Sequence, residues 1–233
     1  MITDVLADYK EIYDRYPATA YLSKAGRKER HIKLTEWAAK DYPALPDIEG
    51  IKAFMQKNPD LKFERPFFLK VAVPCVQKDI DSGDLKSLRF LFECNETDDF
   101  RIGTDRDYVN LFCEGANYKY NAWALADMVL SKEPDNEIVL YYKYRSIKRV
   151  LEYSIHEVPS GVLSGVDGAN KEDIPGMLKR LHEFAAISKK LGKDDGRLIQ
   201  ICETMYEAYG QYLGSFEEYA GFEDYLIRHN IPY

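Results

Sequence analysis

The 233-residue chain is predicted to be all-α, with antiparallel helical hairpins that stack as a short solenoid or form an irregular multi-helix bundle. Two observations predict this class. Apolar residues recur at steps of three and four along most of the chain, which is the period of an amphipathic helix. Capping residues and prolines interrupt this pattern at short intervals, and segments typical of strands do not alternate with segments typical of helices, which disfavours an α/β fold.

The first half of the chain shows this pattern most clearly near its start. Val5, Tyr9 and Ile12 share one face of a predicted first helix, which Thr3 or Asp4 can cap and which Pro17 ends. The helices predicted in this half cover 3–16, 28–41, 47–57, 64–80 and a shorter segment from Leu85 to Phe92.

Residues 64–80 are the ambiguous part of this half. Their dense apolar run is compatible with a β-strand over 67–73 that ends at Pro74. The steps of three and four continue on both sides of Pro74, so we favour a helix that the proline kinks.

The second half continues the helical pattern. The predicted helices cover 104–115, 118–132, 136–157, 171–191, 197–213 and 215–229. Thr104 and Asp107 come close to a capping box, and Pro175 suits a first helical turn. The glycine-rich stretch 161–170 is predicted to be a flexible connection. We therefore expect one helical domain over 1–233, with a possible subdivision near 159–170.

Composition excludes several classes of protein. A hydrophobic content of 45% and a charged content of 30% are ordinary for a globular protein. The net charge of −7 disfavours a general nucleic-acid or anionic-membrane binder. No stretch approaches the length of a membrane-spanning helix, and the N-terminus does not resemble a signal peptide, so a cytoplasmic location is expected. The four cysteines form no CxxC pair and are expected to be buried thiols.

One stretch resembles a known family. Residues 122–144, AWALADMVLSKEPDNEIVLYYKY, are similar to the junction between two tetratricopeptide repeats, with Ala122 and Pro134 separated by twelve residues. The preceding segment departs from that family, since it holds Arg106, Val109, Asn110 and Cys113 where the family has Trp, Leu, Gly and Tyr. His156 also stands where the next repeat would have a small residue. The resemblance implies helical hairpins that bind a protein or peptide, usually without catalysis.

The helix predicted over 136–157 carries the leading candidate site. Its stretch YYKYRSIKR holds four basic residues with interleaved tyrosines and no acid between Ile138 and Leu151. Such residues can clamp a carboxylate, or contact phosphates and stack on bases. The residues that we expect to contact a partner are Tyr141, Tyr144, Arg145, Lys148 and Arg149. A protein or peptide partner is favoured, and the basic patch 143–149 leaves nucleic acid as a less favoured possibility.

A catalytic alternative uses the same helix. Arg149 and His156 are seven residues apart, which places both on one face. This spacing resembles the motif of the helical HEPN ribonucleases, in which a His serves in acid–base chemistry and an Arg steadies the phosphate. The family prefers a polar residue after the Arg, whereas Val150 follows here, and Glu152 between the two favours a plain charge ladder.

No metal or cofactor is predicted. His156 and His182 have acidic neighbours, but neither has a Glu three residues before it, which helical di-metal sites use. The glycines at 161–168 lack the Gly-Lys-Ser/Thr ending of a phosphate-binding loop.

A third interpretation comes from the distribution of charge. Residues 23–33 hold five bases and one acid, whereas residues 201–233 hold six acids and one base, Arg228, together with several tyrosines. An acidic, tyrosine-rich surface suits a basic partner. In general character this resembles the bacterial immunity proteins that block nuclease toxins. The leading expectation remains a non-catalytic helical module that binds a protein or peptide, and whether the chain is an enzyme stays open.

Overall fold

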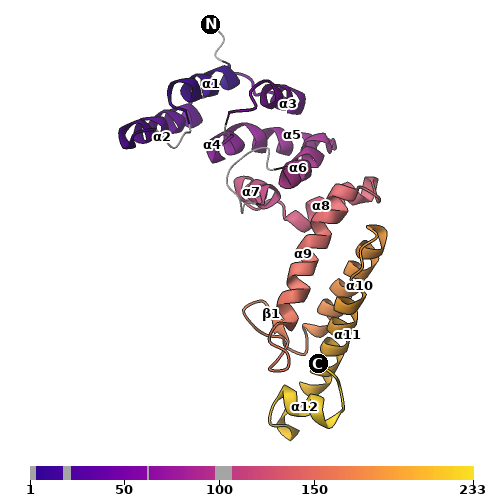
Figure 1. Cartoon of the computed structure of the whole chain (residues 1–233). Helices are drawn as coiled ribbons and strands as arrows, with labels where there is room; N and C mark the ends of the chain where they lie inside the picture. The colour runs from indigo at the N-terminus through magenta and orange to yellow at the C-terminus, as the bar shows by residue number, and fades with distance from the viewer. Residues whose placement is uncertain (1–3, 18–21, 62, 98–106) are drawn as a thin grey trace. The chain divides into compact units, whose positions relative to one another are not determined.

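The chain is all-α, as the periodicity predicts (Figure 1). A computed structural model describes residues 4–17, 22–61, 63–97 and 107–233. The chain divides into two compact units, an N-terminal unit (Met1–Pro134) and a C-terminal unit (Asp135–Tyr233). The division falls at the turn after Glu133, and the expected point of subdivision, 159–170, lies inside the C-terminal unit.

Helical hairpins make up the N-terminal unit. Asp4, Ser23 and Asp47 each cap a helix, because their side-chain oxygens accept a hydrogen bond from a backbone N–H of the first turn. Helix α1 packs on α2, α5 on α6, and α6 on α7 and α8. The elements are α1 (Val5–Arg15), α2 (Lys24–Ala39), α3 (Ile48–Lys57), α4 (Arg65–Phe67), the π-helical segment η1 (Phe68–Ala72), α5 (Val73–Ser82), α6 (Lys86–Thr97), α7 (Tyr108–Gly115) and α8 (Ala122–Lys132).

The ambiguous stretch is helical rather than a strand. Residues 65–82 run without interruption through α4, η1 and α5, and Pro74 lies in the first turn of α5. A proline inside an α-helix removes one hydrogen bond and its ring meets the carbonyl four residues earlier. The π-helical turn Phe68–Ala72, directly before Pro74, widens the helix where that carbonyl, of Lys70, lies.

A cluster of aromatic rings forms the core beneath α1 and α2. The ring centroid of Tyr9 lies 4.9 Å from that of Trp37 and 4.8 Å from that of Phe67. The polar atoms of Trp37 and Tyr9 both have hydrogen-bond partners. Trp37 Nε1 donates to the carbonyl of Val5 at 3.0 Å, and Tyr9 Oη accepts from the backbone N–H of Glu64 at 3.1 Å. Tyr9, Trp37 and Phe67 are buried, so they hold α1, α2 and α4 in fixed positions.

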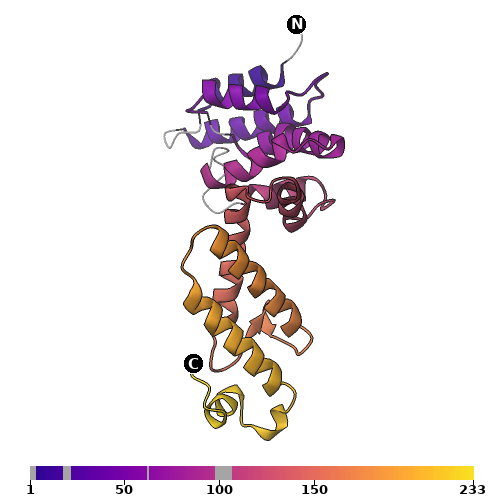
Figure 2. The same ribbon diagram turned by 90° about the vertical axis from the view of Figure 1, so that its right-hand side faces the viewer.

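The C-terminal unit is built on three long helices that lie side by side (Figure 2). Helix α10 packs on both α9 and α11, and α12 packs on α11. Asn136 caps α9. The elements are α9 (Glu137–Ile155), β1 (Leu163–Ser164), β2 (Asp167–Gly168), α10 (Ile174–Lys190), α11 (Gly196–Tyr212), the 3₁₀ turn η2 (Phe216–Glu218) and α12 (Phe222–Arg228).

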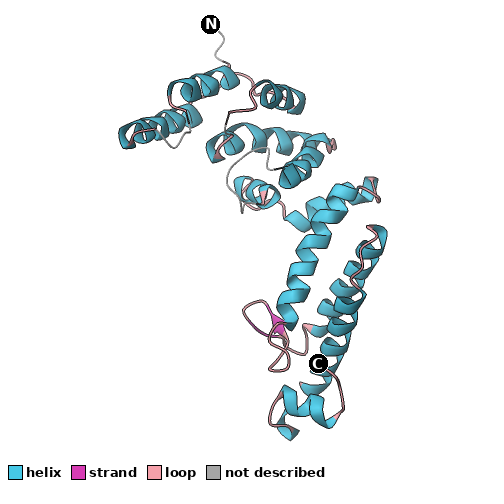
Figure 3. Ribbon diagram, in the orientation of Figure 1, coloured by secondary structure: helices cyan, strands magenta, loops and turns pink. Residues whose placement is uncertain are grey.

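The glycine-rich stretch 161–170 is a small β-hairpin instead of an open connection. Strands β1 and β2 pair antiparallel, with Leu163 opposite Gly168, and they are the strands drawn in Figure 3. The hairpin is anchored by its flanks, because Val162 and Ala169 are buried and are joined by a hydrogen bond of 2.8 Å from N–H to carbonyl.

Several predicted helix bounds are wrong. The single helix expected over 215–229 is two short elements, η2 and α12, separated by residues 219–221. The backbone of Tyr219 is extended, so the helical conformation ends after η2. Ala220 N–H donates to Asp224 Oδ2 at 3.1 Å at the beginning of α12, which forms as a separate helix. Helix α8 begins at Ala122 rather than 118, because Asn121 caps it. Asp107 itself caps α7, and Thr104, the other expected cap, lies outside the described residues.

No helix within the described ranges combines the length and the apolar character that a membrane crossing requires.

The aromatic core predicts the effect of truncating Phe67. Phe67→Ala is expected to lower the free energy of unfolding of the N-terminal unit by about 3–5 kcal/mol, because a buried ring is replaced by a cavity. Chemical denaturation followed by tryptophan fluorescence measures this, since Trp37 and Trp123 both belong to that unit. Ile32→Ala, at a side chain of α2 in the same unit that is 39% exposed, is the control and should cost less than about 1 kcal/mol.

Candidate functional site

The five residues predicted to contact a partner all lie on α9, and they differ in exposure. Tyr144 is buried, Tyr141 and Lys148 are half-buried, and Arg145 and Arg149 are exposed. The structure therefore presents only part of the predicted set to solvent.

Tyr144 and Lys148 belong to a hydrogen-bonded network around Asp195. The carboxylate of Asp195 accepts from Lys148 Nζ at 2.8 Å and from Tyr144 Oη at 3.2 Å through Oδ1, and from Ser188 Oγ at 2.8 Å through Oδ2. The side chain of Asp195 is only 4% exposed, so these donors replace the water that the charge loses. The network ties α9 to the end of α10 and the start of α11.

The network sets the charge of both partners. Burial alone would raise the pKa of Asp195, but the hydrogen bonds from Lys148, Ser188 and Tyr144 outweigh burial and hold that pKa below its ordinary value of 3.8. The hydrogen bonds to Asp195 and Tyr144 raise the pKa of Lys148 above 10.5. Asp195 and Lys148 are therefore both charged at neutral pH. The ammonium group of Lys148 binds Asp195 of its own unit.

Lys143 is also engaged within the unit. It is buried and forms an ion pair with Glu183 of α10. Two of the four basic residues of the stretch 143–149 thus join α9 to the elements that follow it, and they add little to a surface for phosphates.

Tyr141 extends a column of stacked rings towards the surface. The ring of Phe184 stacks on Tyr144 at 5.3 Å, and Tyr144 stacks on Tyr141 at 5.9 Å. The Arg145 guanidinium lies 5.2 Å from the Tyr141 centroid and Lys193 Nζ lies 5.6 Å from it. These cation–π contacts fix Tyr141, and they add Lys193 to the residues that the sequence pattern indicates.

Arg149 on α9 is exposed, and so is His156, the residue that follows the end of α9. The Nδ1 of His156 is 2.6 Å from the carbonyl oxygen of Tyr153, and its Nε2 is 3.0 Å from Glu157 Oε1. No hydrogen bond joins Arg149 to His156 among the described residues, and the ribonuclease hypothesis stays a prediction.

The described part of the chain contains no group of three or more His, Cys, Asp or Glu side chains placed to hold a metal ion. All four cysteines are buried, and burial raises the pKa of Cys113 and of Cys202 to about 11. These thiols are protonated at neutral pH, which makes them poor nucleophiles.

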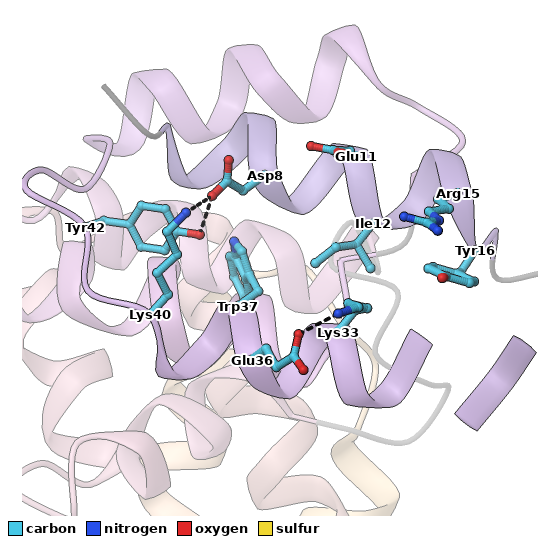
Figure 4. Close-up of a pocket in the computed structure, with 10 residues that line it drawn as sticks. All are labelled: Asp8, Glu11, Ile12, Arg15, Tyr16, Lys33, Glu36, Trp37, Lys40 and Tyr42. Atoms are coloured by element: carbon cyan, nitrogen blue, oxygen red, sulfur yellow. Dashed lines mark hydrogen bonds and ion pairs between the residues drawn. The ribbon is translucent and has the colours of Figure 1, made fainter. Parts of the chain in front are cut away.

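An open cavity of about 350 Å³ lies between α1 and α2 in the N-terminal unit. We call it the α1–α2 groove. In Figure 4, Ile12 and Trp37 lie in its middle, between a cluster of Asp8, Lys40 and Tyr42 at one end and Arg15 at the other. The residues that line it are Asp8, Glu11, Ile12, Arg15, Tyr16, Lys33, Glu36, Trp37, Lys40 and Tyr42.

The charges of the α1–α2 groove are partly paired. Asp8 Oδ2 accepts from Lys40 Nζ at 2.6 Å and from Tyr42 Oη at 2.9 Å, and the hydrogen bond from Lys40 lowers the pKa of Asp8. Glu11 and Arg15, both exposed on α1, form no ion pair with any residue that the structure describes, and the Arg15 guanidinium lies 5.4 Å from the centroid of the Tyr16 ring. The groove thus offers one free charge of each sign beside an apolar middle.

The acidic C-terminal region divides into packed rings and free acids. Tyr206, Tyr209 and Tyr225 are buried, so these tyrosines build the core of the unit. Arg228 pairs with Asp224 at 2.8 Å, which removes the one base of this region from the surface charge. Glu217 and Glu218 remain exposed.

The Asp195 network predicts a pH-dependent stability. Because the pKa of Asp195 is lowered, its contribution is present above pH 3.8 and is lost as the pH falls through the lowered value. Because the pKa of Lys148 is raised, its contribution is present below pH 10.5 and is lost as the pH rises through the raised value. The ion pair therefore stabilises the C-terminal unit between these limits.

Lys148→Met is expected to lower the free energy of unfolding of the C-terminal unit by about 3 kcal/mol at pH 7, because Asp195 is left buried without its cation. The loss should be smaller at pH 3, because in the variant Asp195 is buried without its cation and takes up a proton more readily than in the parent chain. Urea denaturation followed by circular dichroism at both pH values measures this. Lys190→Met is the control, because it breaks an ion pair with Asp135, whose side chain is 88% exposed, and it should cost less than about 1 kcal/mol. An equal loss of stability in both variants at pH 7 would refute the role of the network.

Comparison with protein-family models, with curated proteins and with solved structures finds no match for this chain. A function must therefore be argued from the fold and the surfaces described above.

Proposed function

We propose that this chain is a non-catalytic helical module that binds a protein or peptide partner. The observation that carries the proposal is the α1–α2 groove, with its apolar middle and its free charges of both signs. The resemblance of residues 122–144 to a tetratricopeptide junction supports the same class of function.

The groove has the chemistry of a polypeptide site. Ile12, which is half-buried beside the buried Trp37, offers an apolar contact for one side chain of a partner. Glu11 and Arg15 offer charged contacts for the neighbours of that side chain. Peptide recognition commonly combines an apolar anchor with polar contacts at the rim. The buried rings of Tyr9 and Phe67 hold α1 and α2 in place, so a peptide would meet a preformed surface.

The α9 surface supplies a second contact area under this proposal. Tyr141, Arg145 and Arg149 are the members of the predicted set that reach solvent without belonging to the Asp195 network. Lys143 and Lys148 are paired within the unit, which argues against nucleic acid as the partner. An immunity-type inhibitor is a special case of the same proposal, in which Glu217 and Glu218 would face a basic toxin.

The test begins with selection of peptides from a random twelve-residue library displayed on phage, against the full chain. Ile12→Lys places a charge in the middle of the groove and is expected to weaken binding of the selected peptides about tenfold or more, since it removes the apolar contact. Isothermal titration calorimetry measures the dissociation constants. Ile227→Lys, at a side chain that is 60% exposed on α12, is the matched control and should leave binding unchanged.

The proposal would be contradicted if the selection enriched no peptide above the level of a blank support. It would also be contradicted if the purified chain cleaved RNA and both Arg149→Ala and His156→Ala abolished this cleavage, because that result would assign catalysis to α9. Circular dichroism of each variant confirms that the helices remain folded.

A further inference from the structure

A second cavity of the N-terminal unit, of about 410 Å³, is lined mainly by α3 and α6. We call it the α3–α6 cavity. Its volume falls within the range of about 300–1,000 Å³ that is usual for small-molecule sites. The residues that line it are Lys52, Met55 and Gln56 of α3, Pro59 and Phe63 of the segment that follows α3, and Phe90 and Glu93 of α6.

Two buried phenylalanine side chains, Phe63 and Phe90, give the cavity an apolar wall. The ring of Phe63 contacts those of Phe54 and Phe67, with centroids 6.0 Å and 5.0 Å away, so the aromatic core of the unit holds it in place. Met55, half-buried on α3, extends the apolar lining. A wall that is fixed before binding suits the apolar part of a ligand, because the protein loses little conformational freedom when the ligand binds.

Lys52 and Glu93 are the two charged residues of the lining, and they form no ion pair with each other. Lys52 Nζ lies 4.9 Å from the centroid of the Phe90 ring, a cation–π contact that holds the ammonium group beside the apolar wall. Among the described residues, Lys52 forms its ion pair with Glu49, at 3.8 Å, and the Glu49 side chain is 72% exposed. Glu93, half-buried, follows Phe90 by about one turn of α6 and lies on the same face. The lining thus carries one positive and one negative charge.

These two charges favour one class of ligand over the others. A ligand that is only a cation would meet Lys52 at the face of Phe90, and a ligand that is only an anion would meet Glu93. A purely apolar ligand would remove water from both charges without replacing it, which costs free energy. A zwitterion complements both, because its carboxylate accepts from Lys52 and its ammonium group donates to Glu93. A carboxylate accepts several hydrogen bonds, so Glu93 can bind this group in addition to its neighbours in the fold.

We infer that the α3–α6 cavity binds a free α-amino acid with a large apolar side chain, such as phenylalanine, methionine or leucine. Its side chain lies against Phe63 and Phe90, its carboxylate binds Lys52 and its ammonium group binds Glu93. The interior of a peptide chain fits less well, because its amino and carboxyl groups are joined in neutral amides. The inference is independent of the proposed function, since the α1–α2 groove and the α3–α6 cavity have no lining residue in common.

Isothermal titration calorimetry of the full chain with L-phenylalanine, L-methionine and L-leucine tests the inference. The tightest of the three is expected to bind with a dissociation constant below about 1 mM, and weaker binding by all three would overturn the inference. For that amino acid, the analogue without the ammonium group and the analogue without the carboxylate should each bind at least about tenfold more weakly, since each leaves one charge of the cavity unpaired. For L-phenylalanine these analogues are 3-phenylpropanoate and 2-phenylethylamine. Equal binding by either analogue would also overturn the inference.

Variants of the two charged residues locate the binding. Lys52→Gln and Glu93→Gln should each weaken the tightest amino acid about tenfold or more, because each removes a charge-assisted hydrogen bond, and full binding in either folded variant would overturn the site. Lys57→Gln, at an exposed lysine of α3 that does not line the cavity, is the matched control and should bind as the parent chain does. Ile12→Lys should also keep amino-acid binding, so failure of the peptide proposal leaves this site standing, and the reverse. Circular dichroism checks that each variant is folded.

Discussion

The buried carboxylate of Asp195 constrains how the three long helices of the C-terminal unit pack. A carboxylate that is almost removed from water must be met by donors, and these come from α9 and from the end of α10. The position of α9 relative to α10 and α11 is therefore tied to one side chain at the start of α11. Lys148 pairs with this carboxylate and Lys143 pairs with Glu183, although both lysines lie in a stretch that looks like a basic surface.

In the N-terminal unit the corresponding constraint is aromatic. Tyr9, Trp37 and Phe67 come from three separate helices, and their rings can pack closely only in one arrangement of those helices. The π-helical turn before Pro74 keeps Phe67 and Phe68 on the buried side of a continuous helix. The α1–α2 groove thus lies on a unit whose framework is fixed by large buried side chains.

Most helices could be predicted from the sequence, because each depends on local patterns. Asp4, Asp47 and Asn136 cap helices where the apolar period begins, and these residues are visible in the sequence alone. Errors occurred where the backbone depends on contacts that periodicity does not show. The apolar residues of 215–229 have helical spacing, yet Ala220 bonds to Asp224 and the segment breaks.

The candidate sites were less predictable for the same reason. Tyr144 and Lys148 have the spacing of a surface pair, and their true partner, Asp195, is about fifty residues further along the chain. The α1–α2 groove combines residues from two helices and carries no sequence motif. Tyr118, just after the end of α7, has a left-handed backbone with a φ of 56°. This conformation is equally invisible in the sequence, because a tyrosine after asparagine predicts no such backbone.

The conformation of Tyr118 has a consequence for how this position should vary during evolution. Selection for stability alone favours glycine or asparagine at a left-handed position, so random substitution would remove the tyrosine unless it were retained for another reason. Where stability alone is selected, glycine should therefore replace this tyrosine while the buried Leu111 and Phe112 stay apolar.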